Sequence, residues 1–102
     1  MELHLLRQGI AIEGFPDRSR LLSAFGREQV SGVALAHRFA CLGLEKVVSS
    51  TYIRAAQTAE RFVTAADLTQ RIDWLDDLTP QGDLCVIEEF LQNTAAETIL
   101  MV

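Results

Sequence analysis

The order of secondary structure is clearest in the stretch Lys46-Val47-Val48-Ser49-Ser50-Thr51-Tyr52-Ile53-Arg54. Its first four residues are rich in β-branched side chains, which favour a strand. Residues 55–66 are mostly good helix formers, and Ala56, Ala59, Phe62 and Val63 recur there on one face. The chain is therefore predicted to pass from a strand, through a short connection, into an amphipathic helix.

The same alternation is predicted on both sides of this stretch. Strands are expected at 2–6, 72–74 and 98–102, and helices from Leu22 onward and at 84–92. Ser23 is the expected N-cap of the first helix and Gly43 its expected C-cap. Alternating strands and helices predict an α/β fold, and the apolar run 98–102 is typical of a parallel strand covered on both faces.

Length and charge narrow the class of protein. The chain has 102 residues and predicts one domain over 1–102, with a net charge of −5 that argues against nucleic-acid binding. No apolar run approaches the ~20 residues of a membrane span, and no signal peptide is recognisable. Cys41 and Cys85 lie far apart in apolar surroundings, which predicts two buried, reduced thiols of a cytoplasmic protein.

Three arginines lie where a parallel sheet places its ligands. Arg7 follows the first predicted strand, Arg54 follows the second near the start of a helix, and Arg20 ends a long loop. Guanidinium groups converging at strand ends can form an anion site, because their planar fork matches phosphate. The alternative is that each arginine pairs with one of the 14 Asp and Glu residues on the surface.

Four segments resemble the histidine phosphatase superfamily, which is phosphoglycerate mutase-like, and within it the SixA-type phosphohistidine phosphatases most closely. Residues 1–11 resemble the strand that ends in the family's Arg-His-Gly signature, and residues 20–26 its Arg-Pro-Leu-Thr-x-x-Gly segment. Residues 48–59 match the Ser-Ser-x-x-x-Arg-Ala-x-Gln-Thr-Ala block, and residues 78–83 the Leu-x-Pro-x-Gly-Asp loop. The resemblance implies a three-layer sandwich with a mainly parallel sheet, truncated at its C-terminus.

The resemblance also implies a mechanism without a metal or cofactor. In the family, the histidine of Arg-His-Gly is the nucleophile, and a second histidine after a later strand completes the phosphate pocket. The arginines that match Arg7 and Arg54 hold the phosphoryl oxygens and stabilise the transition state, and the one that matches Arg20 is a further phosphate ligand.

The chain departs from this pattern in two places. The nucleophile position is Gln8, whose amide nitrogen is not basic, and the chain ends at Val102, before the segment that carries the second histidine. His4 lies within the first strand and His37 on the first helix, so neither is expected to replace the nucleophile. A truncated pseudoenzyme, a fragment, and a chain completed by a partner all explain the second departure.

Three functions remain open. The first is a phosphohistidine phosphatase-like hydrolase, with negligible activity expected because of Gln8. The second is a pseudophosphatase that binds a phosphohistidine protein or a small phosphate ligand without cleaving it. The third is a structural remnant whose arginines only pair with carboxylates. An apolar sheet edge left unpaired would favour a homodimer that covers it.

Overall fold

Four parallel strands form the sheet of this protein, whose computed structural model describes residues 1–102. Their order is β1-β4-β2-β3. The strands are β1 (Glu2–Leu5), β2 (Lys46–Ser49), β3 (Ile72–Trp74) and β4 (Thr98–Met101). The predicted α/β architecture is confirmed, and all four predicted strands are present within one residue of their expected bounds.

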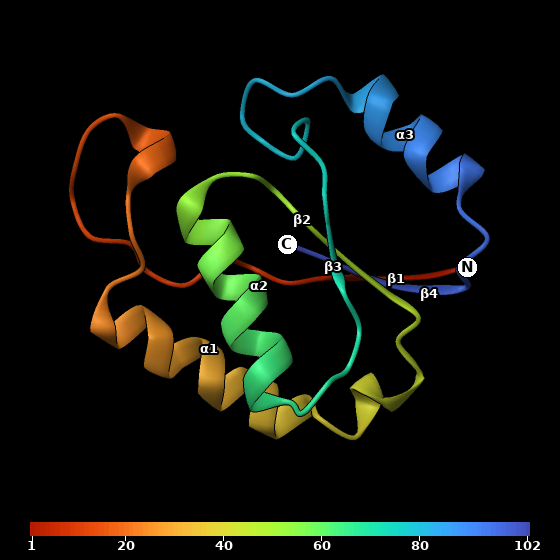
Figure 1. Ribbon diagram of the computed structural model, residues 1–102, viewed down its shortest axis with the longest axis horizontal. Coiled ribbons are helices and arrows are strands. Elements are labelled where there is room, and N and C mark those ends of the chain that lie inside the picture. Colours follow the sequence, from red (N-terminus) through yellow and green to blue (C-terminus); the bar gives the residue numbers. More distant parts are fainter.

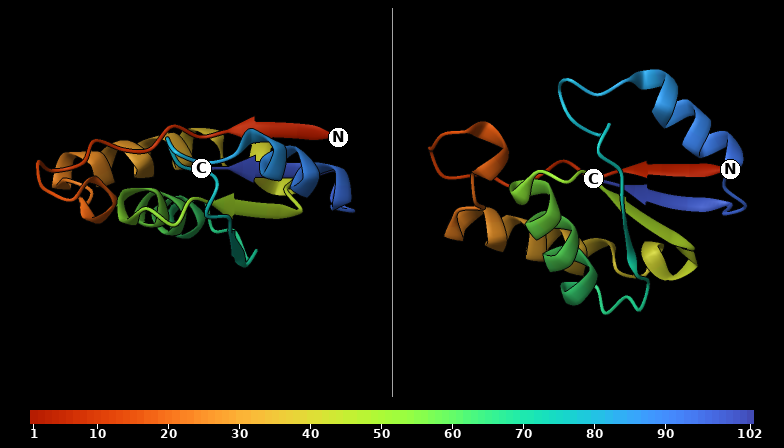
Figure 2. Two further views of the ribbon diagram at one scale, coloured as in Figure 1. Left: turned by 90° about the horizontal axis from the view of Figure 1, so that it is seen from above. Right: turned by 45° about the horizontal axis from the view of Figure 1, so that its top comes forward.

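Helices cover both faces of this sheet, as Figures 1 and 2 show. α1 (Ala24–His37), α2 (Ile53–Ala65) and the 3₁₀ helix η2 (Ala40–Gly43) lie on one face, and α3 (Leu84–Asn93) lies on the other. A second 3₁₀ helix, η1 (Asp17–Ser19), lies in the loop before α1. The molecule measures 37 × 32 × 16 Å, and its short dimension is about the width of four strands spaced ~4.8 Å apart.

The core is built on the two central strands. Ile99, Leu100 and Met101 of β4 are at most 6% exposed, so β4 is covered on both faces, as its apolar sequence predicts. Leu100 packs with its neighbour Val47 and with α1 and α2 through Val30, Ala34 and Phe62. On the opposite face, Lys46 lies over the ring of Phe90 of α3, at 5.5 Å from the ring centroid.

β1 is an edge strand with exposed apolar side chains. Leu3 is 40% exposed and Leu5 is 75% exposed. They pair in register with Ile99 and Met101 of β4, so their side chains lie on the same face of the sheet as those two residues. α3 packs over Lys46 of β2 and leaves this part of the sheet uncovered. β1 is therefore an edge strand whose exposed apolar side chains lie on one face of the sheet.

Two sequence predictions are wrong. Gly43 does not cap α1, because that helix ends at His37 and the chain continues through η2, where Cys41 and Leu44 turn into the core. Cys85 is exposed, because it lies in the first turn of α3, a helix that buries none of its side chains fully. Cys41 is buried as predicted, and burial raises the pKa of its thiol.

The end of α2 is closed by a residue in the left-handed region. Asp67 has φ 56°, its N–H donates to the Thr64 carbonyl (3.2 Å), and the N–H of Leu68 donates to the Val63 carbonyl (2.9 Å). These two bonds form a Schellman motif, in which glycine is the usual residue at the position of Asp67. A carboxylate at a helix C-terminus also opposes the helix dipole.

A single buried hydroxyl connects the end of β1 to α2. Thr58 Oγ1 accepts a hydrogen bond from the Gly9 N–H (3.2 Å) and donates one to the Arg54 carbonyl (2.7 Å). Gly9 also faces α1 so closely that an added Cβ would lie 2.8 Å from the Gly26 carbonyl oxygen. The segment that follows β1 is thus held between α1 and α2. None of the helices is long and apolar enough to span a lipid bilayer.

Asp67→Gly is expected to raise the free energy of unfolding by about 0.5–1 kcal/mol, because glycine adopts a positive φ without a steric cost. Urea unfolding measures this change. Asp67→Asn is the matched control, since it removes the charge alone and keeps a side chain in the left-handed region. Equal stabilisation by both variants would contradict the backbone explanation.

Thr58→Val is expected to lower the free energy of unfolding by about 1–3 kcal/mol, because it leaves the Gly9 N–H without its partner. Urea unfolding gives the energy, and hydrogen exchange of the Gly9 amide gives the location of the effect. Thr58→Ser retains the hydroxyl and should retain slow exchange at Gly9. Unchanged protection of Gly9 in Thr58→Val would show that the hydrogen bond does not hold this segment.

Candidate functional site

An open cavity lies at the carboxyl end of β1, where the loop before α1 and the start of α2 meet. Its volume is about 360 Å³. All four site residues predicted from the sequence line it, and the complete lining is Leu6, Arg7, Gln8, Gly9, Ala11, Arg20, Arg54 and Val102. The cavity therefore combines residues from both ends of the chain with the first turn of α2.

Arg54 is the best-fixed cation of the cavity. Its side chain is 16% exposed and its guanidinium lies 5.0 Å from the centroid of the Tyr52 ring. Nε donates to Gln8 Oε1 (2.9 Å), Nη1 to the Asp17 carbonyl (2.8 Å) and Nη2 to Asp17 Oδ2 (3.1 Å). Every nitrogen of this guanidinium therefore has a partner within the protein.

Arg20 approaches the same carboxylate from the end of the loop. Its Nη1 donates to Asp17 Oδ1 (3.1 Å), and its Nε donates to the Ile12 carbonyl (2.9 Å). Arg20, followed by Arg54, holds the pKa of the Asp17 carboxyl below its ordinary value of 3.8. Arg20 and Arg54 therefore converge on one place, as an anion site requires, and both pair with a carboxylate, as the alternative predicts.

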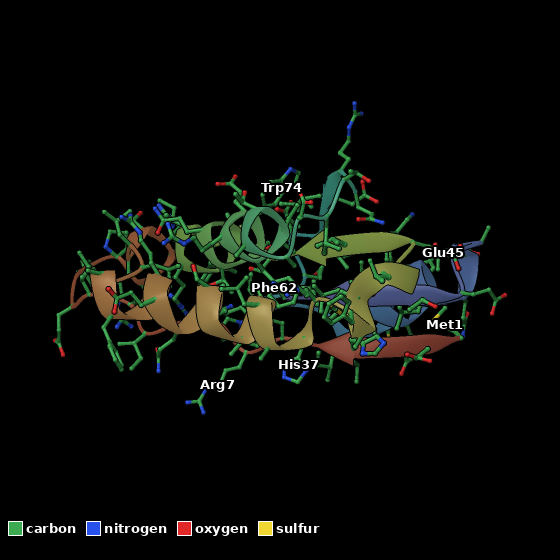
Figure 3. The ribbon with its side chains drawn as sticks, turned by 90° about the horizontal axis from the view of Figure 1, so that it is seen from below. Met1, Arg7, His37, Glu45, Phe62 and Trp74 are labelled. Atoms are coloured by element: carbon green, nitrogen blue, oxygen red, sulfur yellow. The ribbon has the colours of Figure 1, made fainter.

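Arg7 differs from the other two arginines. It lines the rim of the cavity, but its side chain is exposed and extends away from the body of the protein (Figure 3). Successive residues of an extended segment point to opposite sides. Because Gln8 points toward Arg54, the preceding Arg7 points the other way, and the structure brings together Gln8, Arg20 and Arg54 without the Arg7 guanidinium.

Neither histidine of the chain lines this cavity. His4 and His37 line a separate cavity of about 250 Å³, most of whose lining residues are hydrophobic, between β1, α1 and η2. The His4 ring bonds to the Glu2 carboxylate. The nucleophile position of the resembling family is thus occupied by the Gln8 amide, whose oxygen accepts a hydrogen bond from Arg54. No histidine lines this cavity.

Several residues shape the site although the sequence analysis gives them no functional role. Asp17 had no motif to mark it, whereas Gln57 and Thr58 lie inside the block 48–59 that carries the family resemblance. Gln57 Oε1 accepts from the Leu22 N–H (2.7 Å) and so fixes the chain entering α1. Ser49 and Ser50 are buried, and Ser50 Oγ accepts from the Tyr52 N–H (3.2 Å) to shape the turn into α2.

The electrostatics of the cavity favour an anion. Arg54 is the second residue of α2, where the helix dipole is positive and a cation is unfavourable. Arg54 and Arg20 carry two positive charges against the single carboxylate of Asp17, so the cavity keeps an excess positive charge in a chain of net charge −5. No group of three or more His, Cys, Asp or Glu side chains is arranged to hold a metal ion. The arrangement can therefore bind an oxyanion through guanidinium groups.

Comparison with known proteins finds similarity to a phosphohistidine phosphatase. No protein-family model matches the chain. The chain is 27% identical over 103 residues to the phosphohistidine phosphatase SixA of Escherichia coli strain K12, covering all of this chain and 64% of the relative. The chain therefore spans less than two thirds of the length of this curated relative.

Solved structures give the same result for the fold. The protein histidine phosphatase SixA complexed with tungstate superposes with a TM-score of 0.88 at 27% identity, over 99% of this chain and 67% of that one. The putative SixA of Agrobacterium tumefaciens gives a TM-score of 0.82 at 20% identity, over 98% of this chain and 66% of that one. We conclude that this chain has the histidine phosphatase fold and is similar in sequence and structure to SixA-type phosphohistidine phosphatases over about two thirds of their length.

Proposed function

We propose that this protein is a SixA-like phosphate-binding protein in which Arg20 and Arg54 recognise a phosphoryl group and Gln8 prevents its hydrolysis. The observation that carries the proposal is the convergence of these three side chains on one open cavity. Arg54 occupies the N-terminal turn of α2 against the helix dipole, and a position that costs stability is the kind expected at a functional site.

The proposed loss of turnover rests on the chemistry of the amide. In the resembling family a histidine at this position forms a phosphohistidine intermediate. Gln8 has no basic nitrogen, and its oxygen already accepts a hydrogen bond from Arg54 Nε. His4 and His37 line another cavity, so neither supplies the missing imidazole from within the chain. The expected activity of these 102 residues is therefore negligible.

The proposed ligand is a phosphorylated protein, with phosphohistidine as the modified residue, or a small phosphate. Support comes from the resembling SixA structure, which holds tungstate, a tetrahedral oxyanion like phosphate. The cavity is open to solvent and can accept a phosphoryl group carried on a larger molecule. We place the protein in the cytoplasm, where two free thiols, one of them exposed, stay reduced.

The proposed partner for the outer edge of β1 is a second copy of the chain. Glu2 donates its N–H to the Glu97 carbonyl just before β4, and Leu6 donates its N–H to Met101 of β4, so the backbone groups of Leu3 and Leu5 turn to the free edge. Two such edges related by a twofold axis through His4 pair Leu3 of each copy with Leu5 of the other. This pairing also brings together the exposed apolar side chains of both strands.

Tungstate is expected to bind the purified chain saturably, and Arg54→Ala is expected to weaken binding about 10- to 100-fold, the usual effect of losing charged hydrogen bonds. Isothermal titration measures the affinity. Arg61→Ala is the matched control, because Arg61 lies on the same helix, bonds to Ser31 and is outside the cavity. No binding by a demonstrably folded chain would favour the structural remnant instead.

The same preparations are tested for hydrolysis of p-nitrophenyl phosphate and of a phosphohistidine protein. We expect no rate above that of Arg54→Ala, and Gln8→His is not expected to restore full activity, since no second imidazole lines the cavity. A robust rate that Arg54→Ala abolishes would contradict the assignment as an inactive protein.

Leu5→Lys is expected to convert a dimer into a monomer, because a lysine on an edge strand disfavours pairing with another edge. Sedimentation velocity measures the oligomeric state. Leu84→Lys is the control, since Leu84 is a similarly exposed leucine, 66% exposed, on α3. A wild-type chain that stays monomeric at high concentration would contradict pairing through β1.

A further inference from the structure

The anion-binding groups of the cavity already hold an anion that belongs to the chain. Asp17 Oδ1 accepts from Arg20 Nη1 and Asp17 Oδ2 from Arg54 Nη2, each at 3.1 Å. The two oxygens of one carboxylate thus connect the two guanidinium groups that the proposed function assigns to phosphate. An incoming oxyanion meets an occupied pair of arginines.

We propose that Asp17 is an internal competitor of the anion site, whose carboxylate occupies Arg20 and Arg54 until an incoming phosphate replaces it. This inference rests on the proposed phosphate-binding function and adds a residue that sets the threshold for binding. Asp17 lies in η1, a three-residue turn of the loop before α1, and belongs to none of the four segments that resemble the family.

The carboxylate can leave while the loop stays in place. The side chain of Asp17 is 52% exposed, so it can rotate into solvent without opening the core. The loop itself is held by backbone groups: the Asp17 carbonyl accepts from Arg54 Nη1, and the Ile12 carbonyl accepts from Arg20 Nε. Each arginine therefore keeps a hydrogen bond to a backbone carbonyl, through Nη1 of Arg54 and Nε of Arg20, after the carboxylate has rotated away.

Internal competition raises the affinity that any anion needs to occupy the site, so only anions with a high intrinsic affinity bind measurably. When a site is mostly occupied from within, the apparent affinity of every external anion falls by the same factor. A monoanion replaces the Asp17 carboxylate with a group of the same charge, so the arginines gain little free energy from the exchange. A phosphate dianion brings more charge and three acceptor oxygens, so it retains measurable affinity after the same reduction. The site is then kept free of the abundant carboxylates of the cell.

The test compares tungstate affinities of the wild type and Asp17→Asn by isothermal titration. We expect Asp17→Asn to bind tungstate about three- to tenfold more tightly, the size of the change when one or two exposed ion pairs no longer compete. Glu13→Gln is the matched control, because it removes the same charge from an exposed residue of the same loop that has no salt-bridge partner. The control is expected to change the affinity less than twofold.

The outcomes separate this inference from the proposed function. Tighter binding by Asp17→Asn with no change in Glu13→Gln supports internal competition, as does binding by Asp17→Asn alone. Wild-type binding that is unchanged or weaker in Asp17→Asn overturns the inference and leaves the phosphate site in place, with Asp17 then a residue that positions the arginines. An absence of binding in all three folded proteins overturns both.

A second measurement uses the wild-type chain only. Arg20 and Arg54 are the two charged groups that act on the Asp17 carboxyl, and both lower its pKa below 3.8. Saturating tungstate is expected to raise this pKa, because the carboxylate loses both guanidinium partners and gains a nearby dianion. Nuclear magnetic resonance titration of the Asp17 carboxyl follows the change. A pKa that stays low in bound protein would show that tungstate does not displace Asp17.

Discussion

The Thr58 hydroxyl is the contact on which the geometry of the cavity depends. It bonds at once to the turn after β1, through the Gly9 N–H, and to the first turn of α2, through the Arg54 carbonyl. These two segments are far apart in the sequence, and no covalent feature fixes their distance. Because Gln8 precedes Gly9 directly, one buried hydroxyl sets the spacing of Gln8 and Arg54.

The second constraint is the neutralisation of charge within the cavity. Two guanidinium groups and the positive end of a helix repel one another, and a protein without a bound ligand has to balance them. Asp17 supplies the balance from a solvent-exposed loop instead of from the core. A carboxylate in that place stabilises the empty site and opposes its filling, so stability and binding are coupled through the same two ion pairs.

The amino-acid sequence predicts the fold of this protein better than its side-chain directions. The β-branched and apolar runs 46–49 and 98–102 marked the central strands, because burial on both faces leaves a continuous apolar signal. Ser23 was recognisable as an N-cap, and its Oγ accepts from the Gly26 N–H (2.9 Å). The sequence placed Arg7, Gln8, Arg20 and Arg54 at one cavity through strand-end reasoning and resemblance. The outward direction of Arg7 and the role of Asp17 depend on tertiary contacts that no local pattern carries.

The central place of β4 has a consequence for the synthesis of this protein. β1, which is synthesised before the other three described strands, pairs with β4, and β4 follows the other three in the sequence. The first and last segments of the described chain are therefore adjacent in the sheet, a connection of very high contact order. Until β4 emerges, the apolar β1 segment and the faces of α1 and α2 have no complete sheet to pack on. The residues that pack against β4 are thus expected to stay exposed until β4 has been synthesised.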